Sequence, residues 1–238
     1  MGKIYRYECR RLLWNQFFAG LAAVLLGYGA LVLRGVTILG VSHTAPFSPW
    51  SFGDYLSRML PLLWIGALFF LTFFTSPKAR RTAALTDAVP MRPARFTLAR
   101  CAAAFTGTAI LALLCIVEAA VFYGRMFGWY GWGSLAFPAL VTLLPPLVFA
   151  LGSGWLLGRL RPWLLYIWMV VPLLLAVLPL PEVLGLWNGS FFTAYPLTLE
   201  NLDPTFALPG PMVMVQLLLL MAGMALLVFG SKRRSIPI

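Results

Sequence analysis

The sequence predicts an all-α integral membrane protein with six transmembrane helices, and three observations lead to this prediction. Hydrophobic residues make up 61% of the 238 residues and charged residues only 11%, about half the charged fraction of a soluble domain. The apolar residues form long continuous runs, unlike the alternating pattern of a membrane β-barrel. The basic residues behind the net charge of +11 lie in short clusters between these runs. That is the pattern of membrane proteins and argues against nucleic-acid binding.

Six apolar runs are long enough to cross a hydrocarbon core about 30 Å thick, which takes about 20 residues of helix. They belong to a single transmembrane domain over residues 1–238. The predicted spans are residues 17–33, 59–75, 101–123, 135–157, 163–180 and 211–230. Three further segments are an interfacial helix, a cytoplasmic loop and an outer segment, predicted at residues 1–16, 76–94 and 181–210.

Lysine and arginine predict the orientation of these spans. Of the 18 basic residues, only Arg34, Arg58 and Arg125 fall on one side of the membrane, and the others fall on the opposite side. Because cytoplasmic loops are rich in lysine and arginine, both termini are predicted to lie in the cytoplasm, with the chain in the cell (inner or plasma) membrane. Four acids are then expected in outer loops, namely Asp54, Glu182, Glu200 and Asp203.

The first 16 residues predict a helix that lies in the inner membrane interface. On a helical wheel, Tyr5, Cys9, Leu12 and Leu13 share one broad face, and basic residues border it. An amphipathic helix of this kind suits the boundary between headgroups and acyl chains. The helix is predicted to turn from there into the first span.

The cytoplasmic loop predicts a short helix between the second and third spans. Ser76 is a suitable N-cap, Pro77 fits the first turn, and Pro90 and Pro93 end the helix. Two interpretations remain open: the basic residues of the loop only set the topology, or the helix docks onto a cytoplasmic partner. The candidate docking residues are Lys78, Ala79, Arg80, Arg81, Ala83, Leu85 and Asp87.

The outer segment of residues 181–210 is too apolar for an ordinary loop and too rich in proline to span the membrane. We expect short re-entrant helices there, which dip into the outer leaflet between the fifth and sixth spans.

Glu118 is the ionisable residue that falls inside a predicted span, about five residues from its outer end. A residue of this kind is a functional candidate by default, and Glu118 could line a transport path. The alternative is that its side chain reaches outward or pairs with Arg125.

Prolines, methionines and glycines inside the spans have two interpretations each. Pro145 and Pro146 predict a kinked or unwound fourth span, which is either static or a hinge. Met214 and Met221 either line a path or contact lipid. The GxxxG motif that ends at Gly158 permits close helix approach, and packing within the chain is favoured over a dimer contact.

Motifs for covalent chemistry are absent from the sequence. It contains no GxxxxGK[ST] phosphate loop, no HExxH and no GxSxG. Its single histidine, His43, and its scattered cysteines do not form a metal-binding set. Asp54, Asp87 and Asp203 are expected in loops, which does not suit an intramembrane aspartyl protease. The chain is therefore predicted not to be an enzyme, with no catalytic residue, no metal and no cofactor of its own.

Two stretches carry a family resemblance, KIYRYECRRLLWNQFF at the start and TAALTDAVPMRPARFTLARCAAA in the middle. With the six-span layout they resemble the permease subunits of type 2 ABC exporters. In that family the second stretch is a helix, then an apolar-Pro-x-x-R turn, then a basic residue before the third span. Val89-Pro90, Arg92, Arg95 and Arg100 correspond to this pattern, whereas Lys78, Arg80 and Arg81 stand where the family usually has an acid.

The resemblance implies a half-transporter that moves an apolar or amphipathic substrate such as a lipid, a peptide or a drug-like molecule. A second permease chain, identical or related, would form the path with it in the lipid bilayer. Separate ABC ATPase subunits would hold ATP and Mg and push on the loop of residues 76–94 as a coupling helix. The alternative function is a non-transporting assembly or immunity subunit of a larger complex.

Overall fold

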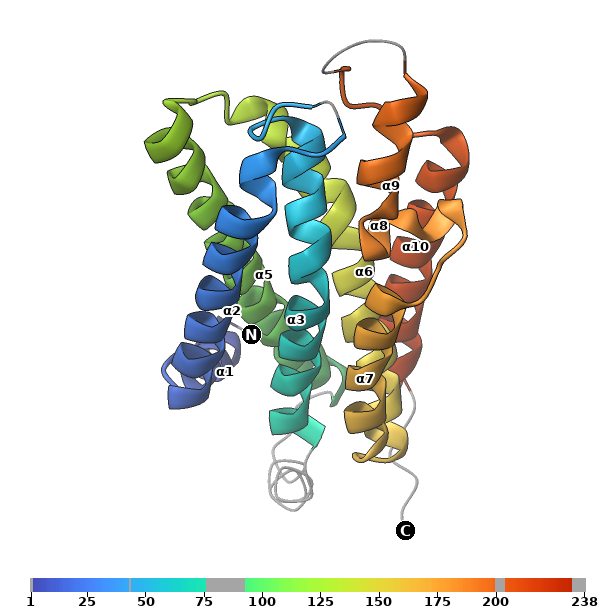
Figure 1. Ribbon diagram of the computed structural model, residues 1–238. Coiled ribbons are helices and arrows are strands. Elements are labelled where there is room, and N and C mark those ends of the chain that lie inside the picture. Colours follow the sequence, from blue (N-terminus) through green and yellow to red (C-terminus); the bar gives the residue numbers. More distant parts are fainter. Residues whose placement is uncertain (1, 43, 76–92, 200–203, 233–238) are drawn as a thin grey trace.

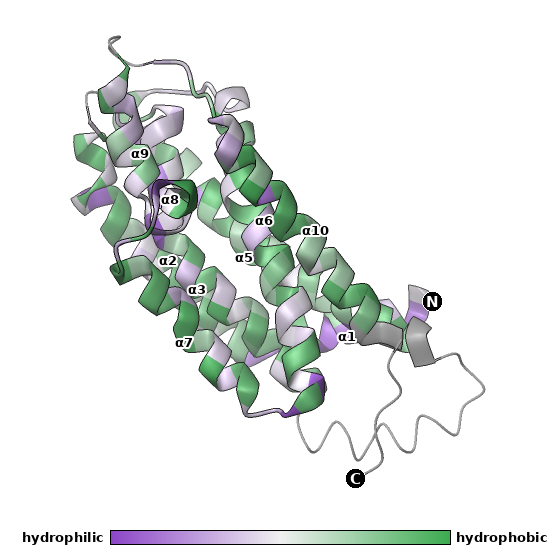
Figure 2. Ribbon diagram, turned by 90° about the vertical axis from the view of Figure 1, so that its right-hand side faces the viewer, coloured by the Kyte–Doolittle hydropathy of each residue, from purple (hydrophilic) through white to green (hydrophobic). Residues whose placement is uncertain are grey.

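The computed structural model describes residues 2–42, 44–75, 93–199 and 204–232, and these form a bundle of helices with no strand among them. Five of these helices are long and apolar enough to cross a membrane, as expected for a multi-pass membrane protein. They are α2 (Gln16–Gly35), α3 (Pro49–Thr75), α5 (Pro93–Phe127), α6 (Gly133–Leu160) and α10 (Gly210–Lys232). Figure 2 shows hydrophobic residues along most of their length. The all-α prediction is confirmed for the described residues.

The fifth predicted span is shorter in the structure than in the prediction. Helix α7 (Leu164–Val177) has 14 residues, about 21 Å at 1.5 Å per residue, against a hydrocarbon core of about 30 Å. It ends because the backbone is extended at Leu178, the residue before Pro179, which has no N–H to donate to a continuing helix. Five candidate spans are therefore present, and the count of six stays a prediction.

Helix α3 begins ten residues before the predicted second span. The hydroxyl of Ser48 accepts a hydrogen bond from the N–H of Ser51 at 3.2 Å, which is an N-cap bond, and Pro49 takes the first helical position. Asp54 and Arg58 consequently lie inside α3. The prediction that Asp54 lies in an outer loop is wrong.

The N-terminal helix α1 (Gly2–Leu13) is present as predicted, but it packs mainly against α5. Its buried side chains are Glu8 and Leu12, while Tyr5 of the predicted apolar face is exposed. Asn15 separates α1 from α2 and caps α2, because its side chain accepts a hydrogen bond from the N–H of Phe17 at 3.3 Å. Figure 1 shows α1 toward the same end of the bundle as the last turns of α10 and the α6–α7 connection. We call this the inner end, after its predicted side.

The described part of the outer segment, residues 181–199 and 204–210, forms four short helices at the opposite, outer end of the bundle. They are η2 (Glu182–Leu184), α8 (Gly185–Asn188), α9 (Ser190–Ala194) and η3 (Tyr195–Thr198). Trp50, near the start of α3, packs against Phe191 and Phe206 with ring centroids 5.6 and 4.9 Å apart. The short helices are thus present as predicted, and their depth in a membrane stays a prediction.

Close packing of glycines fixes α6 within the bundle. An added Cβ at Gly152 would overlap the carbonyl of Gly223 on α10, and one at Gly154 would overlap Leu68 of α3. Packing of the GxxxG segment within the chain is therefore confirmed. Pro145 and Pro146 are buried, and α6 continues through both without unwinding. The proposal of a hinge at these prolines stays a prediction.

Candidate functional site

One turn of α3 gathers polar side chains inside the bundle. Asp54, Tyr55 and Ser57 are buried there, and the side chain of Arg58 is 39% exposed. We call these four residues the polar turn. They lie about 8–14 Å along the helix from Pro49, within a candidate membrane span.

Asp54 and Arg58 form an ion pair one helical turn apart. The Nε–H of Arg58 donates to Oδ2 of Asp54 at 2.8 Å, and Asp54 is 1% exposed. A buried carboxylate needs such a partner, because burial of an unpaired charge is costly. Oδ1 of Asp54 has no hydrogen-bond partner in the described part of the chain, and it faces the outer helices.

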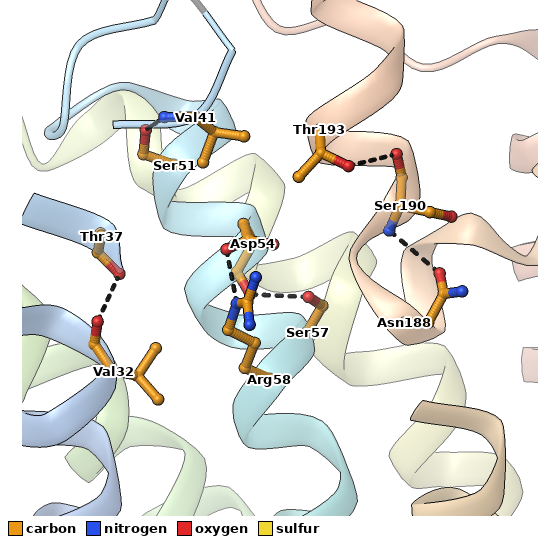
Figure 3. A network of polar contacts seen from close by, with 10 residues as sticks. All are labelled: Val32, Thr37, Val41, Ser51, Asp54, Ser57, Arg58, Asn188, Ser190 and Thr193. Atoms are coloured by element: carbon orange, nitrogen blue, oxygen red, sulfur yellow. Dashed lines mark hydrogen bonds and ion pairs between the residues drawn. The ribbon is translucent and has the colours of Figure 1, made fainter. Parts of the chain in front are cut away.

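Gly189 brings the outer helices onto the polar turn. It links α8 to α9 with a φ of +80°, and an added Cβ would lie 2.7 Å from both Oδ1 of Asp54 and Oγ of Ser57. The left-handed backbone and the lack of space both require glycine. Around it, Oδ1 of Asn188 accepts a hydrogen bond from the N–H of Ser190 at 3.1 Å. Figure 3 shows this turn beside the polar turn.

Tyr55 connects the polar turn to Glu118 on α5. Its hydroxyl lies 3.3 Å from Oε2 of Glu118 and 3.3 Å from the carbonyl of Cys115, so it can donate to either. A Cβ at Gly29 of α2 would overlap the Glu118 carboxylate, so glycine allows three helices to meet here. Among the described residues, no ion pair joins Glu118 to Arg125.

A single strip of α3 is left partly exposed by its neighbours. The other side chains from Trp50 to Thr75 are buried, and the exceptions, which we call the open strip, are Arg58, Leu62, Ile65, Phe69, Thr72 and Phe73. Phe17 of α2 packs against Phe69 and Phe73, with ring centroids 5.9 and 6.2 Å away. Figure 1 shows α3 between α2 and α7 on this side of the bundle. Arg58 lies at the outer end of the strip, above apolar side chains.

The other predicted path residues are not brought to the polar turn. Met214 and Met221 are each 65% exposed on α10, whereas Met212 and Gln216 on the same helix are buried. The two methionines therefore lie on the outward face of α10. The docking candidates Lys78, Ala79, Arg80, Arg81, Ala83, Leu85 and Asp87 lie outside the described residues.

A second buried acid, Glu8 of α1, was missed by the sequence prediction. Glu8 is 3% exposed, and its carboxylate lies 3.4 Å from Nε of Arg100 and 3.8 Å from Nη1 of Arg11. The guanidinium of Arg100 also lies over the ring of Phe96 at 4.1 Å, a favourable cation–π contact. These contacts tie α1 to the start of α5, the helix that follows the predicted docking loop.

The sequence held signals for both missed acids. Ser48-Pro49 is an N-cap followed by proline at the first helical position, and Asp54 and Arg58 have the spacing of a helical ion pair. Glu8 lies four residues before Leu12, so the two share a helical face. A prediction based on apolar runs alone begins the second span at Met59, so it leaves out Ser48-Pro49, Asp54 and Arg58.

No protein-family model, no curated protein and no solved structure matches this chain. The resemblance to exporter permeases therefore rests on the residues quoted for it. Any functional proposal depends on the chemistry and geometry of this chain.

Proposed function

We propose that this chain is the permease subunit of a type 2 ABC exporter, which works with a second permease chain and with separate ATPase subunits that hold ATP and Mg. The observation that carries the proposal is the order of the helices. An amphipathic α1 precedes the long helices, and the broken helices α8 and α9 pack onto α3 before the last long helix. This order corresponds to the layout of that family.

The open strip of α3 supports a transport path. Helix α3 is the most buried of the long helices, yet one strip of it remains uncovered between α2 and α7. In the proposed dimer this strip faces the second permease chain. A path formed there is lined by Arg58 at the outer end and by apolar side chains below it.

The contact between α1 and α5 supports a link to the ATPase. The proposed coupling helix lies within the predicted loop of residues 76–94. The last two residues of that loop belong to α5, which begins at Pro93 and holds Arg100. Because Glu8 binds Arg100 across 92 positions of sequence, a push on the start of α5 would also move α1. ATP-driven closure of the ATPases could then shift the balance between two arrangements of the bundle.

Co-purification tests the proposal. The tagged chain is isolated from its native membranes in mild detergent, together with the variants Leu85→Asp and Ala88→Asp. We expect an ABC ATPase to co-purify with the wild-type chain. Leu85→Asp should weaken this complex about tenfold or more, because a charge buried in a docking cleft costs about 1–3 kcal/mol. Ala88→Asp adds the same charge on the side of the predicted helix opposite the small apolar face and should have little effect.

Two results would contradict this proposal. One is that no ATPase co-purifies while other membrane proteins do, which would favour an assembly or immunity subunit. The other is that Leu85→Asp retains the whole complex, which would remove the docking role of the loop.

A further inference from the structure

Arg58 is the charged side chain on the open strip of α3. Its guanidinium has five N–H donors, and Asp54 accepts from Nε–H at 2.8 Å. No other hydrogen bond joins it to the described residues, and the side chain is 39% exposed. An exposed arginine at membrane depth is costly unless an acidic group meets it. The remaining donors of Arg58 therefore suit a bidentate anion.

Asp54 holds this guanidinium in place. The carboxylate is 1% exposed, and it lies between Arg58 on one side and Gly189 on the other. The buried acid fixes the arginine at its Nε edge and leaves the two terminal nitrogens for another group. Figure 3 shows the pair on α3, with the outer helices across from it.

The rest of the open strip is apolar except for Thr72, whose hydroxyl donates to the carbonyl of Phe69. Leu62, Ile65, Phe69 and Phe73 continue from Arg58 toward the inner end and are partly exposed. Arg58 and Phe73 are fifteen residues apart, about 22 Å along the helix, and one leaflet has a hydrocarbon thickness of about 15 Å. The strip is therefore long enough for an acyl chain whose headgroup is bound at Arg58.

We propose that the open strip binds an amphiphile with an acidic phosphate headgroup, as in an anionic phospholipid, with the phosphate on Arg58 and the acyl chain on Leu62–Phe73. The inference rests on the proposed function in that the bound molecule is taken as the transported substrate. Charge complementarity with Arg58 selects an anionic lipid over a zwitterionic one, and the apolar strip selects a lipid over free phosphate.

Native mass spectrometry of the purified full-length chain in detergent micelles tests this binding without any ATPase. The probes are phosphatidylglycerol and phosphatidylcholine with identical acyl chains, and inorganic phosphate serves as competitor. We expect phosphatidylglycerol to bind about tenfold more tightly than phosphatidylcholine, the difference that one charge-assisted contact supplies. Millimolar phosphate should not displace it.

Arg58→Gln keeps a long polar side chain and should abolish the preference for phosphatidylglycerol. Arg34→Gln removes another exposed arginine, at the end of α2, and should leave it unchanged. If Arg58→Gln does not fold, Ile65→Trp fills the strip and should lower the binding of phosphatidylglycerol while Arg58 remains.

Equal binding of the two lipids, or an unchanged preference in Arg58→Gln, would overturn the inference. Displacement by phosphate alone would also overturn it and indicate a free-anion site. Each of these results leaves ATPase co-purification untouched, so failure of the lipid site and failure of the proposed function can be told apart.

Discussion

The two ends of the bundle each bury an acid against an arginine, but they do so in different ways. At the outer end, Asp54 and Arg58 lie one turn apart on the same helix, with a bond of 2.8 Å. At the inner end, Glu8 of α1 meets Arg100 of α5 at 3.4 Å and is also close to Arg11. The outer pair needs only α3 to form, whereas the inner pair forms only when α1 docks on α5.

This difference assigns separate tasks to the two pairs. The outer pair orients Arg58 toward the open strip and packs against Gly189, so its task is to position the proposed binding site. The inner pair joins two elements that are far apart in sequence, so it serves the attachment of α1. Changes at the outer pair should alter ligand contacts, and changes at the inner pair should alter the docking of a whole helix.

The largest expected effect concerns which side of the membrane each end faces. Single cysteines at residue 195 and at Ile238 should give opposite results with a membrane-impermeant thiol reagent in a cysteine-free background. Residue 195 should be labelled from outside, and Ile238 should react only after lysis, because the basic residues favour a cytoplasmic inner end. Labelling of both positions from the same side would show that α10 does not cross between them, and would remove the distinction between the two ends.

Gly189→Ala should destabilise the outer end by about 3 kcal/mol. The left-handed backbone costs a side chain about 1–2 kcal/mol, and the new methyl group would lie 2.7 Å from both Asp54 and Ser57. Thermal unfolding in detergent measures the effect. Gly128→Ala is the matched control, since Gly128 has a φ of +61° with nothing within 4 Å of an added Cβ. An equal loss in both variants would mean that contact with the polar turn contributes nothing.

Glu8→Gln should loosen α1 by about 2 kcal/mol, because it removes the charge that binds Arg100 across the α1–α5 contact. Cys9 is a free, partly buried cysteine on α1, so its rate of thiol labelling reports local opening of this helix. The rate should rise by about tenfold or more in Glu8→Gln. Asp54→Asn should leave it unchanged. The opposite pattern would contradict the division of tasks between the two pairs.

Tyr55→Phe should have the smallest effect, a loss of about 1 kcal/mol, because it removes one hydrogen bond and keeps the ring. Glu118→Gln retains a partner for the Tyr55 hydroxyl and should cost less stability. If Glu118 lines the path, its variant should transport more slowly at normal expression, whereas Tyr55→Phe should only unfold at a lower temperature. Equal transport by both variants and the wild type would indicate that Glu118 contributes to packing and does not line the path.

Features that follow from the order of apolar residues and prolines along the chain could be predicted from the sequence. Continuous apolar runs predict the long helices, and prolines in residues 181–210 predict short ones. The polar turn could not be predicted in the same way, because Tyr55 and Glu118 come together only through the packing of α3 on α5. The place of Gly189 against Asp54 likewise depends on contacts across 135 positions of sequence. Glu8 was overlooked because the other charged residues of its helix are basic, and because its partner Arg100 lies 92 residues away in the sequence.

The most direct test of the central claim is ATP turnover by the co-purifying ATPase, reconstituted in lipid vesicles with and without this chain. We expect turnover in the complex with the wild-type chain to differ from that of the ATPase alone, and to return to that level with Leu85→Asp, which should weaken docking about tenfold or more. Turnover that is identical with the wild-type chain, with Leu85→Asp and with no chain at all would contradict the assignment as an exporter permease.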